Sequence, residues 1–485
     1  MSFRLILFLC LSLVGLLVSG CGNDDDIPIP SPSGTGEEGV VEVWRTTANE
    51  SLLLQEDTQE LPLLEEWEAD LTIELDSQTT LQVMDGFGAA LTGSSAHVIN
   101  THLNNSERTS LLRSLFDPAD GIGISYIRLT VGASDFSRFD YTYNDLPPGE
   151  TDPQLANFDL SVEEENLIPV LQEIISIRPD IKIMATPWSP PSWMKSNDAL
   201  YPGGMLLPIY EEVFAAYLVK YIQAMAGYGI PIHSITVQNE PLYAAPYPSM
   251  EMDAARQRDF IKNQLGPALH DAGLSTEILI YDHNWDNTDY PISILDDAAA
   301  KDFITGSAFH CYAGDVSAMS SVHAAHPDKG IYFTECSGGE FSPDFSNNLA
   351  WNAENLLVGA TRNWAKTILL WNLALDEQNG PRNGGCQDCR GVVEINSGNG
   401  VIKRNVEYYL LGHMAKFIQP NAIRMASPNT RPQGVSQVAF QNADSSQVIV
   451  LFNHQATEME IAVQTKQDKA FVVTMAPGSL VTCRW

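Results

Sequence analysis

Basic residues are scarce in this sequence of 485 residues. It contains 27 Lys and Arg against 61 Asp and Glu, which gives a formal net charge of −34. A surface with this excess of negative charge repels phosphate backbones and other polyanions. We therefore expect no nucleic-acid partner and no polyanionic ligand.

Cysteine is also scarce. The seven cysteines stand at positions 10, 21, 311, 336, 386, 389 and 483, too few for a disulfide-rich scaffold in a chain of this length. Cys386 and Cys389 have the spacing of half a zinc site, but no second pair follows. We prefer a local disulfide here over free thiols, and zinc is the least favoured alternative. Cys336 is expected to be a packing residue, and no metal or organic cofactor is implied.

Long apolar runs are absent beyond the N-terminus. The run Leu5–Val18 follows Arg4 and is too short to span a bilayer, which is typical of a secretory signal. It ends in Val-Ser-Gly-Cys at Cys21, similar to a bacterial lipobox; ordinary cleavage near an incidental cysteine is the alternative. Residues 1–21 are thus predicted to be a signal peptide with a lipidated cysteine, and residues 22–38 a disordered linker. We expect an exported lipoprotein of a bacterial outer membrane or cell surface, or of the periplasm, whose lipid is its only membrane contact.

Internal repeats and glycine-rich phosphate loops are absent as well, and residues 83–404 alternate β-rich runs with amphipathic helical stretches. Helices are expected near Pro169 and from Ile209 to Ala224. Eight β–α units predict an α/β fold, a (β/α)₈ TIM barrel, over a doubly wound open sheet. The eight strand candidates are Val83–Phe87, Ser125–Val131, Ile181–Thr186, Ile232–Gln238, Glu277–Tyr281, Ser307–Tyr312, Gly330–Thr334 and Thr367–Leu373.

The two ends of the chain have a different pattern of apolar and polar residues. Residues 405–485 contain short runs that alternate apolar and polar side chains, separated by polar turns. Residues 39–82 contain similar runs in Val41–Trp44 and Leu71–Leu75. We expect both ends to form one β-sandwich beside the barrel.

Carboxylates and aromatic residues stand at the carboxyl ends of the predicted strands, where the active site of such a barrel lies. Glu240 ends the fourth strand and Glu335 the seventh, so they face each other across the ring and can approach to about 5 Å. Such a pair performs retaining glycoside hydrolysis, with Glu240 as general acid/base and Glu335 as nucleophile. Glu240 is expected to have a raised pKa, and Asn239 to bond the sugar 2-hydroxyl. Glu340 is a rival nucleophile.

The sequence resembles glycoside hydrolase family 30, a family of retaining (β/α)₈ glycosidases. The motifs that carry the resemblance are Gly86–Thr92, Tyr126–Arg128, Ser134–Ser137, Thr186–Lys195, Asn239–Pro241, Ala308–Tyr312, Thr334–Cys336 and Tyr408–His413. By that resemblance, the −1 subsite is lined by Arg128, Asp135, Trp188, Asn239, His310, Tyr312 and Trp371. Family members often have Trp where Cys311 stands. The resemblance also implies a side β-sandwich built from both termini.

Some of these residues could instead have purely structural roles. Arg128 could be an ion-pair partner of Asp135, while His310 and Trp371 could belong to the core. The resemblance implies a carbohydrate substrate, and an exported enzyme suits β-1,6-glucan. Glucosylceramidase, β-glucosidase and β-xylosidase activities are alternatives. A surface glycan-binding lipoprotein without catalysis is the rival class, disfavoured because both carboxylates are present.

Overall fold

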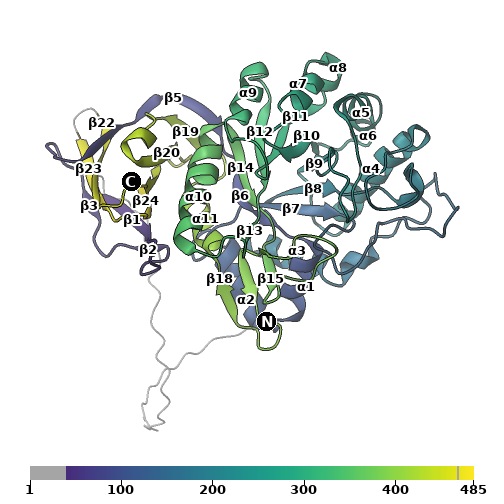
Figure 1. Cartoon of the computed structure of the whole chain (residues 1–485), viewed down its shortest axis with the longest axis horizontal. Helices are drawn as coiled ribbons and strands as arrows, with labels where there is room; N and C mark the ends of the chain where they lie inside the picture. Colours follow the sequence, from purple (N-terminus) through teal and green to yellow (C-terminus); the bar gives the residue numbers. More distant parts are fainter. Residues whose placement is uncertain (1–39, 467–468) are drawn as a thin grey trace, which may run out of the picture. The chain divides into compact units, whose positions relative to one another are not determined.

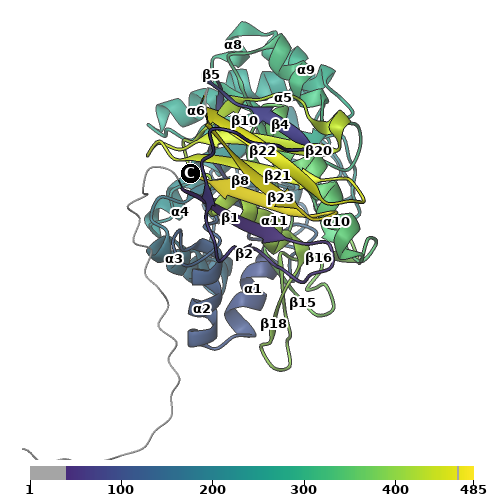
Figure 2. The ribbon, with the colours of Figure 1, turned by 90° about the vertical axis from the view of Figure 1, so that its left-hand side faces the viewer.

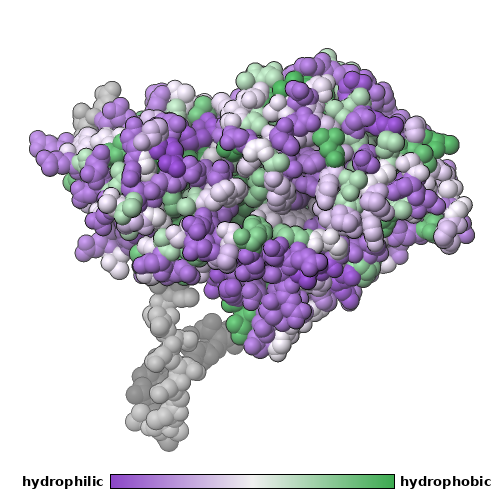
Figure 3. All heavy atoms as spheres, in the orientation of Figure 1, coloured by the Kyte–Doolittle hydropathy of each residue, from purple (hydrophilic) through white to green (hydrophobic). Residues whose placement is uncertain are grey.

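The computed structural model describes residues 40–466 and 469–485. The expected signal peptide, lipidated Cys21 and linker lie outside the described residues. Within the described part of the chain, every helix is too short or too polar to cross a membrane. Hydrophilic side chains predominate on the face drawn in Figure 3, where hydrophobic residues lie in small, separate groups.

The middle of the chain forms a closed eight-stranded parallel barrel, which confirms the predicted fold class (Figure 1). Around the ring the strands follow the order β10-β11-β12-β14-β6-β7-β8-β9. Six side chains from six of these strands form one buried cluster that includes Tyr126, Met184 and Tyr332, as expected for a filled barrel interior. The strands are β6 (Gly86–Ala90), β7 (Tyr126–Val131), β8 (Lys182–Pro187), β9 (Ser234–Thr236), β10 (Glu277–Asn284), β11 (Ile304–His310), β12 (Gly330–Glu335) and β14 (Ala365–Leu370).

Helices follow the barrel strands, and the two helices expected from periodicity are present as α3 and α4. Helix α4 begins at Glu211 rather than Ile209 because Pro208–Tyr210 forms a 3₁₀ turn. Its buried stripe includes Phe214, Tyr217 and Tyr221. The helices are α1 (Gly93–Thr101), α2 (Asn105–Phe116), α3 (Leu167–Ile177), α4 (Glu211–Gly227), α5 (Ala254–Phe260), α6 (Gly266–Asp271), α7 (Asp289–Leu295), α8 (Ala298–Lys301), α9 (Ala318–Ala325), α10 (Phe345–Asn352) and α11 (Val406–Ala415).

Strands from both ends of the chain form the expected side β-sandwich. The first strand pairs with the last, β1 with β24, while β5 pairs with β19 and β4 with β22. The purple N-terminal strands therefore lie among the yellow C-terminal ones (Figures 1 and 2). The strands are β1 (Val40–Thr46), β2 (Gln55–Glu56), β3 (Leu61–Pro62), β4 (Leu71–Glu74), β5 (Asp76–Val83), β19 (Ile423–Ala426), β20 (Val435–Gln441), β21 (Gln447–Asn453), β22 (Met459–Lys466), β23 (Lys469–Met475) and β24 (Leu480–Arg484).

Helix α11 opens the segment that follows residue 404 and contacts both barrel strand β6 and sandwich strand β24. His413 of this helix is fully buried, and its two ring nitrogens lie 2.9 Å from the hydroxyls of Thr482 and Thr46. Burial lowers the pKa of His413 to about 3, so the ring is neutral and one nitrogen accepts. This histidine therefore joins the barrel helix to both terminal strands.

Short strands after β12 and β14 were not expected from the sequence. Strand β13 pairs with β16, and β15, β17 and β18 form a small sheet. A buried ion pair, Arg390 Nη2 to Glu407 Oε1 at 2.9 Å, ties β16 to α11. These short strands bring the 386–389 segment to the carboxyl end of the barrel. Their bounds are β13 (Gly338–Gly339), β15 (Ala374–Asp376), β16 (Cys389–Arg390), β17 (Val393–Ile395) and β18 (Ile402–Arg404).

Candidate active site

Unusual backbone conformations mark the carboxyl ends of the barrel strands. Glu240, Tyr281, Asp282 and Asn372 all have positive φ, at 43°, 73°, 56° and 68°. Such left-handed conformations are costly for residues other than glycine and cluster at functional sites. The strand ends are therefore built to aim particular side chains rather than to continue a regular ladder.

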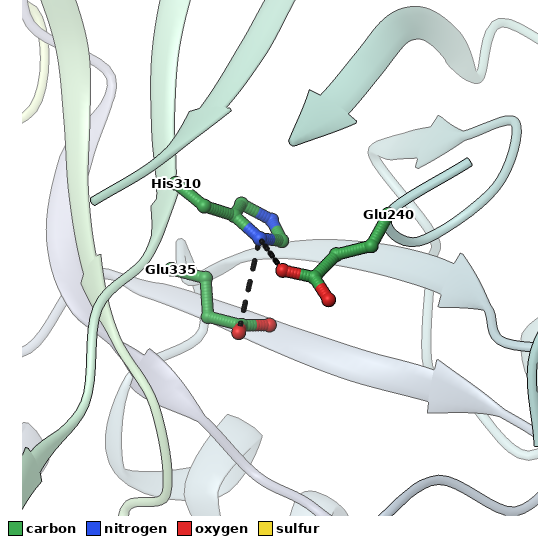
Figure 4. Close-up of side chains that lie close together, drawn as sticks. All are labelled: Glu240, His310 and Glu335. Carbon is green, nitrogen blue, oxygen red and sulfur yellow. Dashed lines mark hydrogen bonds and ion pairs between the residues drawn. The ribbon is translucent and has the colours of Figure 1, made fainter. Parts of the chain in front are cut away.

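Glu240 and Glu335 approach each other across the barrel mouth, on either side of His310 (Figure 4). One oxygen of each carboxylate lies within 4.8 Å of the other. This proximity fits the separation of about 5–5.5 Å in retaining glycosidases rather than about 6.5–9.5 Å in inverting ones. Glu340, the rival nucleophile, is exposed in the following loop, where its backbone nitrogen bonds Asp388.

Glu335 accepts a hydrogen bond on each oxygen. Arg128 Nη1 donates to Oε2 at 2.5 Å, and the Tyr312 hydroxyl donates to Oε1 at 2.9 Å. The other terminal nitrogen of Arg128 donates to Asn239 Oδ1 at 2.8 Å. The Arg128 guanidinium is fully buried and pairs with Glu335 and Asp282, so the alternative of an Arg128–Asp135 ion pair is wrong.

Asp282, near the end of β10, follows a predicted strand but was not among the residues expected to line the −1 subsite. Its side chain is fully buried and accepts from Arg128 and Thr236 on Oδ2, at 2.9 and 2.8 Å. His310 Nε2 lies 3.0 Å from its Oδ1, which also accepts from Thr334 at 2.7 Å. Although burial opposes ionisation, the charges of Arg128 and His310 hold the pKa of Asp282 far below its ordinary value. Its place at a strand end was the available signal.

Protons in the site are distributed by His310, whose Nδ1 lies 3.3 Å from Glu240 Oε1. Burial opposes its charge, but Glu335 and Asp282 outweigh burial and raise the pKa of His310 to about 9. Burial likewise favours a neutral Glu240, yet the hydrogen bond and charge of His310 bring the pKa of Glu240 below its ordinary value. The expected raised pKa of Glu240 is thus wrong for the substrate-free protein. The site carboxyl whose pKa is raised well above its ordinary value is Asp135, because of its burial and the charges of Glu335 and Glu240.

Aromatic rings form one wall of the site. Trp188 and Trp371 stack with ring centroids 5.2 Å apart, and the guanidinium carbon of Arg128 lies 5.0 and 5.6 Å from their centroids. Both indoles are almost fully buried but line the cavity, so Trp371 packs and faces the site together. Asp135 lines the same cavity. Of the side chains expected to line the −1 subsite, Arg128 and His310 are fully buried and do not line the cavity, while the other five do: Asp135, Trp188, Asn239, Tyr312 and Trp371.

The cavity above the two carboxylates has a volume of about 940 Å³. That is near the upper end of typical ligand pockets, about 300–1,000 Å³. Several large apolar side chains that line it are strongly exposed: Leu242, Tyr243 and Tyr312 at 46%, Trp351 at 45% and Phe341 at 61%. Phe341 and Trp351 were not foreseen, because they lie between β12 and α10 or within α10, where no strand-end rule applies.

Two disulfides border the cavity. The Cys386–Cys389 disulfide is present as preferred from the sequence, so free thiols and a half zinc site are excluded there. Cys336 is buried in the core, as expected of a packing residue, and it also forms a disulfide with Cys311 that was not expected. Cys311 directly follows His310, so this cross-link lies beside that residue.

Glu240, His310 and Glu335 have ligand atoms close enough to hold a metal ion. The geometry does not favour one, because a histidine whose pKa is about 9 is protonated at neutral pH and offers no lone pair. Both oxygens of Glu335 are already engaged by donors. The cluster is better explained as an ion-pair network.

Comparisons with known proteins agree on one family. Residues 84–418 match the glycosyl hydrolase family 30 TIM-barrel domain, and residues 421–483 match the family 30 β-sandwich domain. An endo-1,6-beta-D-glucanase of Neurospora crassa is 35% identical over 428 residues, covering 85% of this chain and 87% of that protein. Mouse lysosomal acid glucosylceramidase is 30% identical over 86% of this chain and 83% of its own. The solved structure of the endo-beta1,6-glucanase BT3312 superposes with a TM-score of 0.86, at 36% identity, covering 92% of this chain and 99% of that one.

Proposed function

The chain belongs to glycosyl hydrolase family 30, and we propose that it cleaves β-1,6-linked glucan internally, with retention of configuration, through a covalent glycosyl-enzyme. The observation that carries this proposal is a carboxylate pair at retaining distance in a large cavity lined by aromatic side chains. The identity to endo-1,6-glucanases over most of the chain supports the linkage.

Glu335 is the nucleophile in this proposal. Arg128 and Tyr312 each donate to one of its oxygens, so the carboxylate is held in a single orientation. An acceptor-only carboxylate beside a guanidinium carries the negative charge needed to attack C1. Formation of the ester with C1 removes that charge from the site.

Glu240 is the general acid and base. The leaving oxygen departs as the C1–O bond breaks, and it needs a proton to avoid leaving as an alkoxide. In the substrate-free site, His310 and Glu240 share one proton, which lies on His310. Glu240 passes this proton to the leaving oxygen. When Glu335 becomes an ester, one of the two charges that raise the pKa of His310 is gone, so transfer of the proton from His310 through Glu240 to the leaving oxygen is favoured. In the second step, ionised Glu240 takes a proton from the attacking water.

The cavity rim supports a polymeric substrate. A β-1,6 linkage places a methylene between the leaving oxygen and the next ring, so the acceptor sugar swings more freely than in other glucans. Exposed aromatic faces restrain such a ring by stacking, since the C–H faces of a pyranose are apolar. Tyr243, Phe341 and Trp351 offer three such faces beyond the catalytic pair.

Product analysis tests the proposal. The domain from residue 39 is incubated with linear β-1,6-glucan, β-1,3-glucan, glucuronoxylan, glucosylceramide and 4-nitrophenyl β-glucoside. We expect early products of mixed length from β-1,6-glucan, with the β-anomer appearing first by NMR. Early α-anomer would refute retention, and glucose as the sole early product would refute internal cleavage. Binding without any turnover would favour a non-catalytic glycan-binding protein.

Glucosylceramide is the second candidate. Leu242, Phe341 and Trp351 make part of the rim apolar enough for a lipid aglycone, and the mouse relative is named a glucosylceramidase. Higher kcat/KM for glucosylceramide than for β-1,6-glucan would favour this alternative.

We also propose that the protein is exported and anchored through lipid on Cys21, at a bacterial outer membrane or cell surface or in the periplasm. The support is the Val-Ser-Gly-Cys end of the apolar run. Phase partition in detergent tests it: the wild type should enter the detergent phase and Cys21→Ser should not. Equal partition of both would refute lipidation at this cysteine.

A further inference from the structure

The disulfide Cys311–Cys336 joins the two strand ends that carry His310 and Glu335. Cys311 directly follows His310, the last residue of β11, and Cys336 directly follows Glu335, the last residue of β12. Of the two disulfides in the described residues, this one is adjacent in sequence to the proposed catalytic machinery. Its position raises the question of what it holds in place.

The backbone ladder between these strands is irregular at this point. Pairing runs evenly up to Phe309 with Phe333, then shifts so that His310 lies opposite Glu335 and Thr334 has no partner. Irregularities of this kind re-aim side chains and end regular pairing, and they occur next to active sites. One paired position, His310 with Glu335, follows the irregularity, and the disulfide joins the next residue of each strand, where the ladder has ended.

Tyr312 depends on that spacing. Its hydroxyl donates to Glu335 at 2.9 Å, yet the residue is 46% exposed, so packing restrains its ring little. A hydrogen bond from its backbone nitrogen to Asn284 Oδ1, at 3.1 Å, holds it to β10, not to β12. Beyond the single paired position of His310 and Glu335, Tyr312 is linked to the backbone of Glu335 through Cys311, the disulfide and Cys336.

We infer that Cys311–Cys336 is a positioning element that keeps the Tyr312 hydroxyl on the nucleophile, and that its reduction lowers turnover. The inference rests on the proposed role of Glu335. Cys311 is half-buried and lines the cavity, so a small dithiol can reach it. Dithiothreitol supplies two electrons and two protons, the S–S bond becomes two thiols, and the reductant becomes its cyclic disulfide.

The test is a cycle of variants assayed on 4-nitrophenyl β-glucoside, which does not depend on the linkage preference. Cys311→Ser/Cys336→Ser should lower kcat about ten- to a hundredfold, the effect of weakening one hydrogen bond to a charged group, with KM within about twofold. Tyr312→Phe should lower kcat similarly. The triple variant should be little worse than either, because both changes remove the same contact.

Three outcomes would overturn the inference. One is wild-type kcat in the disulfide variant; another is multiplication of the two effects in the triple variant, which would indicate a merely structural cross-link. The third outcome comes from the variant Cys386→Ser/Cys389→Ser, which keeps only the Cys311–Cys336 disulfide near the cavity. In this variant we expect dithiothreitol to lower kcat and reoxidation to restore it. Loss of that sensitivity would assign it to the other disulfide. Turnover of the aryl glucoside without turnover of β-1,6-glucan would refute the proposed substrate and leave this test readable.

Discussion

Replacing Asp282 by Asn perturbs the network that holds both proposed catalytic carboxylates. Asp282 accepts four hydrogen bonds, two on each oxygen, from Arg128, Thr236, His310 and Thr334. In Asn one acceptor oxygen becomes an NH₂ donor, which must face two of these donors. The variant keeps the shape of the side chain but removes its charge and half of its acceptor capacity.

The expected cost to stability follows from burial. Arg128 and Asp282 are both fully buried, so water does not replace the lost charge, and Arg128 keeps only its ion pair with Glu335. Removing one partner of such a pair costs about 3–5 kcal/mol in the free energy of unfolding. Two charge-assisted bonds of about 1.5–3 kcal/mol each lead to the same range. Turnover should also fall, because Arg128 and His310 orient Glu335 and Glu240.

The pH dependence has a definite sign. The pKa of His310 is raised from 6.5 to about 9, so its contribution to stability is complete below pH 6.5 and is lost as the pH rises through 9. For the wild type this loss is of the order of 3 kcal/mol. Asp282 is one of the two charges that raise this pKa, so the loss should be smaller in Asp282→Asn.

Urea unfolding at pH 6, 7, 8 and 9 measures both effects, and kcat/KM over the same range follows the activity. Asp302→Asn is the matched control, because Asp302 is exposed just before β11, and it should match the wild type. If Asp282→Asn unfolds within about 1 kcal/mol of the wild type, with the same pH slope, Asp282 is not the hub that the geometry indicates.

Three further predictions concern single side chains. Glu335→Gln should lower kcat by at least about 10⁴-fold with an unchanged circular dichroism spectrum, and near-normal turnover would mean that another residue is the nucleophile. Trp351→Ala should lower kcat/KM on β-1,6-glucan about tenfold more than on 4-nitrophenyl β-glucoside, since stacking acts on the acceptor ring; equal losses would argue against an acceptor platform. Arg390→Met leaves the carboxylate of Glu407 buried and should cost about 3–5 kcal/mol in urea unfolding, whereas a cost below about 1 kcal/mol would show that the pair contributes little.

The barrel could be predicted from the sequence because its strands are apolar runs that recur between amphipathic helices. The first barrel strand begins later than expected, at Gly86, since Val83 belongs to β5 and pairs with Ile423 of the sandwich. Apolar character alone does not show which of two sheets a strand joins. The short strands β13 and β15–β18 were missed because strands of two or three residues carry no periodic signal.

The part of the site that lies at the carboxyl ends of the barrel strands could be predicted from the sequence. Parallel strands converge at their carboxyl ends, so Arg128, Glu240, His310 and Glu335 could be brought together from sequence order alone. The disulfide Cys311–Cys336 could not, because it depends on the shifted register between β11 and β12. That shift is a property of the backbone, and no residue type in either strand predicts it.

The pKa of Glu240 could not be predicted from residue types alone. Two carboxylates close together favour a proton on one of them, and that argument holds if nothing stands between them. Here His310 lies within 3.3 Å of Glu240 and 3.8 Å of Glu335, with Asp282 behind it. The proton that the pair requires is therefore held on the imidazole, and Asp135 becomes the neutral carboxyl. The sequence predicts one proton, on Glu240, whereas the fold favours protons on His310 and Asp135, because it puts His310 between the two acids and buries Asp135 beside them.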